Sequence, residues 1–174
     1  MTRSYPAALP IAYVTLRLLI VFNWLAGAAI LALLLASSLN EQWIMAAFKI
    51  SASPEGERLI MGLRAVAVLG LVSIPINHIV LKRLLALVES VRTGDPFIAA
   101  NAERLQTIAW ALLALQLLSL VIAAIGMAVS TPAQPLELDA GFSITGWLAV
   151  LLTFVLARVF AEGAMMRDEL EGTV

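Results

Sequence analysis

Four long apolar stretches dominate this chain of 174 residues, and each has about the 20 residues that a helix needs to cross the hydrocarbon core of a membrane. They cover residues 18–39, 63–81, 108–129 and 144–161. The chain is 61% hydrophobic and 13% charged, whereas soluble domains average about 45–50% and about 25%. A soluble domain of this size covers only about 70% of its surface on folding, so it cannot hide so many apolar residues. We therefore predict an all-α integral membrane protein, a single domain over residues 1–174 with four transmembrane helices packed as a four-helix bundle.

The charged and reactive residues exclude several classes of function. The 11 basic and 12 acidic residues leave no overall basic field, so direct nucleic-acid binding is not expected. With no cysteine and one histidine, the chain has no thiolate ligand and no histidine cluster for a metal ion. It also shows no nucleophile beside a base and no glycine-rich phosphate loop. We expect a protein that is not an enzyme and that uses no cofactor or metal.

The basic residues predict the orientation of the spans, because Lys and Arg near span ends are retained on the cytoplasmic side. With both termini in the cytoplasm, the outer side holds three basic residues, namely Lys49, Arg58 and Arg64. The cytoplasmic side then holds eight: Arg3, Arg17, Lys82, Arg83, Arg92, Arg104, Arg158 and Arg167. We therefore expect the N-terminus and the C-terminus inside, with residues 162–174 as a charged cytoplasmic tail.

The outer connection over residues 40–62 carries two local signals. Its apolar residues recur at helical spacing: Trp43, Ile44, Ala47 and Phe48. This pattern is typical of a short helix lying at the membrane interface, and it suits equally a loop whose aromatic side chains cover the bundle. Ser53 and Pro54 have the residue types of an N-cap and a first helical position, so we expect the second long helix to begin there.

The segment of residues 82–107 continues the helical pattern beyond the second span. Its apolar positions form one stripe, made of Leu84, Leu85, Val88 and Val91. Gly94 can end a helix in the left-handed conformation, Asp95 can cap the next helix, and Pro96 suits its first position. We therefore predict a cytoplasmic α-hairpin extension between the second and third transmembrane helices, with the third helix beginning near Pro96.

Polar side chains within spans are costly in lipid, so each is a candidate for function. Five lie toward the cytoplasmic leaflet in the predicted orientation: Asn23, Asn77, His78, Arg158 and Glu162. They favour either a polar cavity with His78 as a proton or ligand sensor, or ordinary hydrogen bonds between helices with Arg158 and Glu162 paired one turn apart. Arg64, at the outer end of the second span, is expected to extend outward toward Glu57.

Two motifs on the predicted cytoplasmic side resemble a known family. The first is Gly94-Asp95-Pro96-Phe97 followed by Asn101 and Arg104-Leu105, and the second is Phe160-x-Glu162-Gly163-Ala164-x-Met166-x-x-Glu169-x-x-x-Thr173-Val174. Together they resemble the bacterial membrane family catalogued as domain of unknown function 2975. The resemblance implies a multi-pass protein of the bacterial cytoplasmic (inner) membrane, often encoded beside a small helix-turn-helix regulator of the Cro/CI type. It implies no catalysed reaction.

From these features we expect a protein that holds a soluble cytoplasmic partner, such as that regulator, at the lipid bilayer. The predicted partner-binding side chains belong to the hairpin and the tail: Arg83, Arg92, Asp95, Asn101, Arg104, Glu162 and Glu169. The alternative is a small oligomeric transporter, channel or lipid-binding membrane protein. Ala28, Ala32 and Ala36 place one small residue on each turn, which favours close approach of a helix from the same bundle or from a second copy in a homo-oligomer.

Overall fold

The computed structural model describes residues 8–47, 53–130 and 140–171, and these ranges are almost entirely helical. The helices are α1 (Ala8–Leu39), α2 (Glu41–Ala47), α3 (Pro54–Arg92), α4 (Ala99–Val129) and α5 (Ile144–Glu171). Several residues used in the sequence predictions lie outside the described ranges: Arg3, Phe48, Lys49, Thr173 and Val174.

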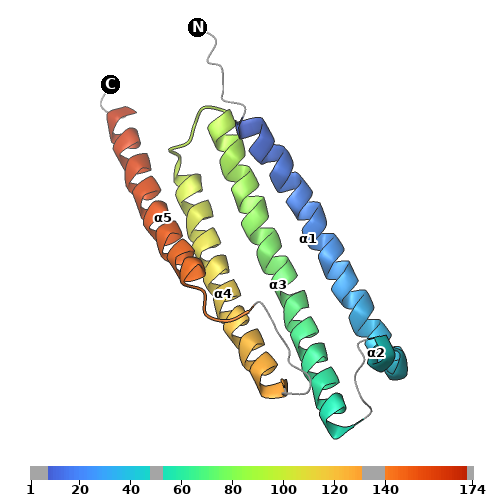
Figure 1. The fold of residues 1–174 in the computed structure, drawn as a ribbon. Helices are drawn as coiled ribbons and strands as arrows, with labels where there is room; N and C mark the ends of the chain where they lie inside the picture. The colour runs from blue at the N-terminus through green and yellow to red at the C-terminus, as the bar shows by residue number, and fades with distance from the viewer. Residues whose placement is uncertain (1–7, 48–52, 131–139, 172–174) are drawn as a thin grey trace.

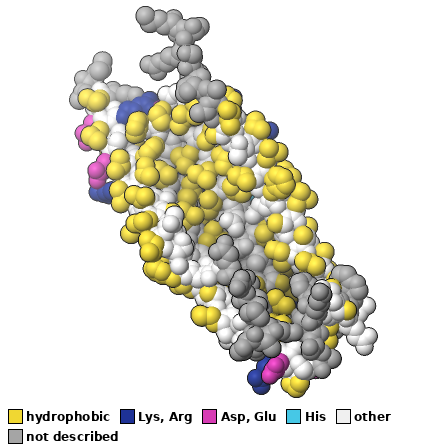
Figure 2. All heavy atoms as spheres, in the orientation of Figure 1, with side chains coloured by type: hydrophobic (Ala, Val, Ile, Leu, Met, Phe, Trp, Pro, Cys, Tyr) yellow, Lys and Arg dark blue, Asp and Glu magenta, His cyan; other side chains and the backbone are white. Residues whose placement is uncertain are grey.

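Four of these helices are long and apolar enough to cross a membrane, as the four apolar stretches of the sequence predicted. At a rise of 1.5 Å per residue, the 39 residues of α3 reach about 58 Å, well beyond a hydrocarbon core of about 30 Å. Large apolar side chains such as Phe22 and Leu152 stay at least 60% exposed, and Figure 2 shows hydrophobic side chains over much of one face. This is the architecture of a multi-pass membrane protein.

The four long helices lie side by side in the order α1, α3, α4, α5 (Figure 1). Close packing joins the same neighbours, α1 with α3, α3 with α4 and α4 with α5, while α2 contacts α1. Because α1 and α5 occupy opposite edges, the four helices of the predicted bundle form an open row. In lipid the row need not close, since lipid tails are as apolar as the helix faces they cover.

The helix boundaries confirm some of the local signals. Ser53 is the N-cap of α3, its Oγ accepts a hydrogen bond of 3.2 Å from the Gly56 N–H, and Pro54 opens the helix. At the other end of α3, Gly94 has the predicted left-handed conformation, with a φ of 87°. Residues 41–47 form the short helix α2 and not a loop. The position of α2 at the membrane interface stays a prediction.

The start of α4 differs from the prediction. The helix begins at Ala99, three residues after Pro96, and its N-cap is Ile98, which has extended backbone angles and no side-chain cap. Asp95 does not cap this helix because its carboxylate pairs with Arg167 of α5. Asp95 and Pro96, whose residue types signal a helix start, therefore lie in the connection between α3 and α4, which is held by tertiary contacts.

Candidate functional site

One end of the row joins residues that are far apart in the sequence. There the connection between α3 and α4 meets the last turns of α5. Six residues make the main contacts, and we call this set the latch: Asp95, Phe97, Asn101, Phe160, Gly163 and Arg167. The latch brings together the two motifs on which the family resemblance was based.

Asn101 is the fully buried centre of the latch, with none of its surface exposed. Its Nδ2 donates to the Ser90 Oγ and to the Pro96 carbonyl, both at 2.7 Å. Its Oδ1 accepts a hydrogen bond of 2.7 Å from Arg104, which also donates to the Ala86 carbonyl at 3.2 Å. These bonds tie the end of α3, the connection and the first turns of α4 together. A side chain this deeply buried is not accessible to a partner, so the structure gives Asn101 a role in packing and its predicted partner contact gains no support.

Asp95 and Phe97 connect the same loop to α5. The Asp95 carboxylate forms an ion pair with Arg167, which also donates to the Phe97 carbonyl at 3.5 Å. The Phe97 and Phe160 rings lie 5.3 Å apart between centroids. A Cβ at Gly163 would lie 3.1 Å from the Phe97 ring, so glycine allows this approach. Sequence reasoning missed the pairing of Arg167 because 72 residues separate it from Asp95.

Beside the latch, a groove of about 490 Å³ runs along α4 and α5. Its apolar surface comes mainly from small side chains: Ala99, Ala102, Ala157, Ala161 and Ala164. Phe154 and Met165 also line it, while Glu103, Arg158 and Asp168 place charges along it. Arg158 is paired with Glu162 at 2.8 Å, as predicted for neighbours one turn apart. The groove thus combines an apolar surface with exposed charges at its edges.

The remaining predicted partner residues lie on the surface of this end of the molecule. Arg83, Glu162 and Glu169 are exposed. Arg92 is also exposed, and it pairs with Glu89 at 3.0 Å and lies over the Tyr13 ring. Within the described ranges, no group of three or more His, Cys, Asp or Glu side chains is placed to hold a metal ion.

The five polar residues predicted within the spans do not form one cavity. On the α1–α3 side, Asn23 donates to the Ile74 carbonyl at 3.0 Å, and the Trp24 indole N–H donates to His78 Nδ1 at 3.3 Å. Arg158 and Glu162 lie on α5, at the opposite edge of the row. This separation supports hydrogen bonding between helices over a shared polar cavity. No sequence pattern indicates the contact of Trp24, since 54 residues separate it from His78.

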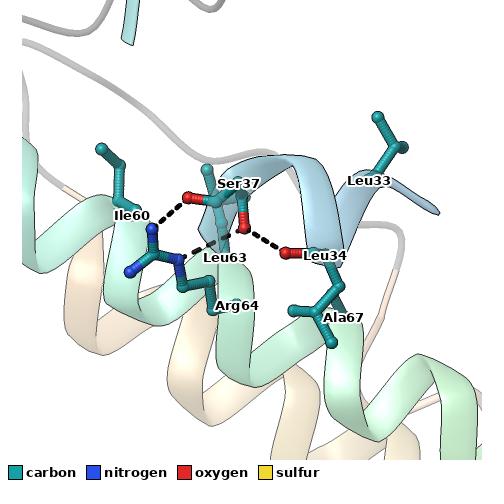
Figure 3. Close-up of a pocket in the computed structure, with 7 residues that line it drawn as sticks. All are labelled: Leu33, Leu34, Ser37, Ile60, Leu63, Arg64 and Ala67. Carbon is teal, nitrogen blue, oxygen red and sulfur yellow. Dashed lines mark hydrogen bonds between the residues drawn. The ribbon is translucent and has the colours of Figure 1, made fainter. Parts of the chain in front are cut away.

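A second, smaller pocket lies between α1 and α3 (Figure 3). Its volume is about 150 Å³, and five apolar side chains line it with Ser37 and Arg64. Arg64 reaches across to α1, where its Nε donates to the Ser37 Oγ at 3.3 Å and its guanidinium also binds the Ser37 carbonyl. The carbonyls of the last helical turn lack partners within the helix, so Arg64 caps the negative end of α1.

The comparisons with known proteins identify a family and no activity. A family model described as "Protein of unknown function (DUF2975)" matches residues 4–174, which is essentially the whole chain. No curated protein and no solved structure matches the chain. The family match confirms the resemblance of the two latch motifs to the family, whose description assigns no reaction or ligand.

Proposed function

Because the chain belongs to the DUF2975 family, whose function is unknown, we propose a function from the geometry of its latched end. The protein resides in the bacterial cytoplasmic membrane with both termini inside, and it holds a cytoplasmic partner in the groove between α4 and α5. The partner is a small helix-turn-helix transcription regulator. Tethering keeps this regulator at the membrane, and no chemical reaction is involved.

The observation that carries this proposal is the groove itself. Small side chains such as Ala102 and Ala161 let the backbone of a bound helix approach α4 and α5 closely. Glu162 neutralises Arg158, while Glu103 and Asp168 lie in no ion pair within the described ranges. The groove is therefore negative overall. A protein that binds DNA phosphates carries surface Lys and Arg, so its charge complements these carboxylates.

The latch supplies a route for releasing the partner. The Asp95 and Arg167 side chains are 45% and 40% exposed, and an ion pair this accessible contributes about 1 kcal/mol or less. Separation of the end of α5 from the connection between α3 and α4 breaks this exposed ion pair together with the contact between the Phe97 and Phe160 rings. Because α5 forms one side of the groove, such a movement changes the groove directly.

The predicted transporter or channel gains no support from this arrangement. A single open row of helices encloses no path across a membrane within the described residues (Figure 1). A pathway would need a second copy to close the row. The tethering proposal requires one chain only.

Orientation is the first test of the proposal. A reporter that is active only in the cytoplasm, fused after Val174, is expected to be active in cells. A matched fusion after Gln134, in the connection between α4 and α5, is expected to be inactive. Activity of the second fusion and not of the first would place the groove on the outer side and refute the proposal.

Partner binding is tested by co-purification from mild detergent with a co-expressed helix-turn-helix regulator from the same gene neighbourhood. Ala161→Trp fills the groove, and we expect it to abolish co-purification. Val159→Trp is the matched control, because Val159 is exposed on α5 and does not line the groove. Equal recovery with both variants, or no recovery with the wild-type chain, would contradict the proposal.

A further inference from the structure

A group of basic side chains at the α1–α3 edge of the row is separate from the groove and the latch. We propose that Arg17 and Arg92, arranged around Tyr13, bind the phosphate headgroup of an anionic phospholipid. This site lies on the other edge of the row from α5 (Figure 1), so the inference does not depend on partner binding. It requires only that the chain lies in a membrane.

Tyr13 brings the two arginines together from different helices. The Arg17 Cζ lies 4.7 Å from the centroid of the Tyr13 ring, and the Arg92 Cζ lies 4.9 Å from the same centroid. The two guanidinium groups are therefore within about 10 Å of each other. Contact with the ring face holds each cation in place, while the guanidinium edges keep donors for another acceptor. Arginine donors of this kind match the oxygens of a phosphate.

The local charge favours an anion. Arg92 binds Glu89 at 3.0 Å, which occupies part of one guanidinium. Arg17 is exposed and lies in no ion pair within the described residues. Arg17 and Arg92 together thus carry more positive charge than Glu89 neutralises, and the positive potential attracts an anionic headgroup.

A hollow beside Arg92 provides space for such a group. Its volume is about 330 Å³, and its lining is Leu9, Pro10, Glu89, Arg92 and Thr93. The lining contains both apolar and polar side chains. Such a lining suits the part of a lipid where the phosphate joins the glycerol. Tyrosine is common at this depth, where an amphipathic ring lies between the hydrocarbon and water.

The surface next to the arginines indicates a lipid over a free phosphate. From Arg17 onward, α1 exposes large apolar side chains toward the middle of the span, beginning with Leu18 at 54% and Leu19 at 45%. Acyl chains attached to a headgroup at Arg17 can lie along this face and bury apolar surface. Inorganic phosphate has no such interaction available. A bound headgroup also bridges α1 to the end of α3, which stabilises the packing between them.

The test uses the full chain purified in mild detergent, with native mass spectrometry of retained lipid. We expect the wild-type chain to retain phosphatidylglycerol in preference to phosphatidylcholine, and Arg17→Gln with Arg92→Gln to lower that ratio about tenfold, which corresponds to about 1.4 kcal/mol. Arg58→Gln is the matched control, because Arg58 is an exposed arginine at the other end of α3. It is expected to leave the ratio unchanged.

Three results would overturn the proposal. The first is a double variant whose lipid ratio stays within twofold of the wild type. The second is an Arg58→Gln control that lowers the ratio as much as the double variant does, which would indicate binding by the overall positive charge and not by this site. The third is a rise in Tm with inorganic phosphate equal to that with phosphatidylglycerol, which would assign the site to soluble phosphate. If the double variant does not fold, Arg17→Gln alone decides, because its described contact is the Tyr13 ring, and an unchanged ratio then refutes the site.

Discussion

Replacement of Asn101 by alanine removes the centre of the latch. The side chain has no exposed surface and makes three hydrogen bonds, each of 2.7 Å, to Ser90, Pro96 and Arg104. The Pro96 carbonyl loses its Asn101 donor in the variant. Arg104 keeps its bond to the Ala86 carbonyl, and the Ser90 hydroxyl keeps its donation to the Leu87 carbonyl.

The expected loss of stability follows from these bonds. A neutral hydrogen bond contributes about 1 kcal/mol net and one to a charged group about 2 kcal/mol, so the three bonds of Asn101 amount to about 4 kcal/mol. The bonds that Ser90 and Arg104 keep reduce this to about 3 kcal/mol. For a chain of this length, that free energy corresponds to a fall in Tm of about 6–12 °C.

The measurement is thermal unfolding of the purified full chain in mild detergent, followed by helical circular dichroism. Asn77→Ala is the matched control, since Asn77 is half-buried in α3 and makes no hydrogen bond in the described structure. We expect this control to lower Tm by less than about 2 °C, as for substitutions away from networks. A double-mutant cycle with Ser90→Ala is expected to give a coupling of about 1 kcal/mol. An Asn101→Ala variant that melts within about 2 °C of the wild type, or a control that falls as far, would refute the assigned network.

Three further predictions concern contacts between helices. Asp95→Asn and Arg167→Gln are each expected to lower the free energy of unfolding by no more than about 1 kcal/mol, because the two side chains are 45% and 40% exposed. Hydrogen exchange in the last turns of α5 is expected to increase in both variants. A loss of stability above about 2 kcal/mol would contradict this prediction. Gly62→Ala places a Cβ 2.7 Å from both methyl groups of Val129 and is expected to cost about 1–3 kcal/mol in unfolding measurements. Val129→Ala in the same chain should restore part of that loss, and no restoration would exclude this contact as the cause. In a chain with Trp24 as its one tryptophan, His78→Ala removes the acceptor of the indole hydrogen bond and is expected to shift the tryptophan emission. An emission spectrum that His78→Ala leaves unchanged would contradict this contact.

Local signals in the sequence predicted the elements well. The length and hydropathy of the spans were sufficient to identify four apolar helices, because a helix that crosses lipid must satisfy its backbone internally and expose apolar side chains along its whole length. Ser53, Pro54 and Gly94 were also correctly interpreted, since a cap or a left-handed residue acts within a few positions of itself. The pairing of Arg158 with Glu162 is local for the same reason.

The candidate site was harder to predict because its residues compete for partners across the fold. Asp95 and Pro96 have the residue types of a helix start, yet the ion pair with Arg167 and the bond from Asn101 hold them in a connection. The residue type of Asn101 equally suits an exposed loop contact, and its complete burial appears only when α3, α4 and the connection meet. Arg64 follows the same pattern, because the end of α1 supplies acceptors for its guanidinium.

Sequence alone therefore determined the class of protein, the number of long helices and most of their ends, since each depends on residues within one or a few turns. Tertiary structure decided that the helices form an open row, that the two motifs meet as a latch, and that a groove with exposed charges lies beside it. These features depend on pairs of residues far apart in the chain, such as Asp95 with Arg167, 72 positions away. Hydropathy carries no information about such pairs, because in lipid any apolar face can be covered equally well by a helix or by acyl chains.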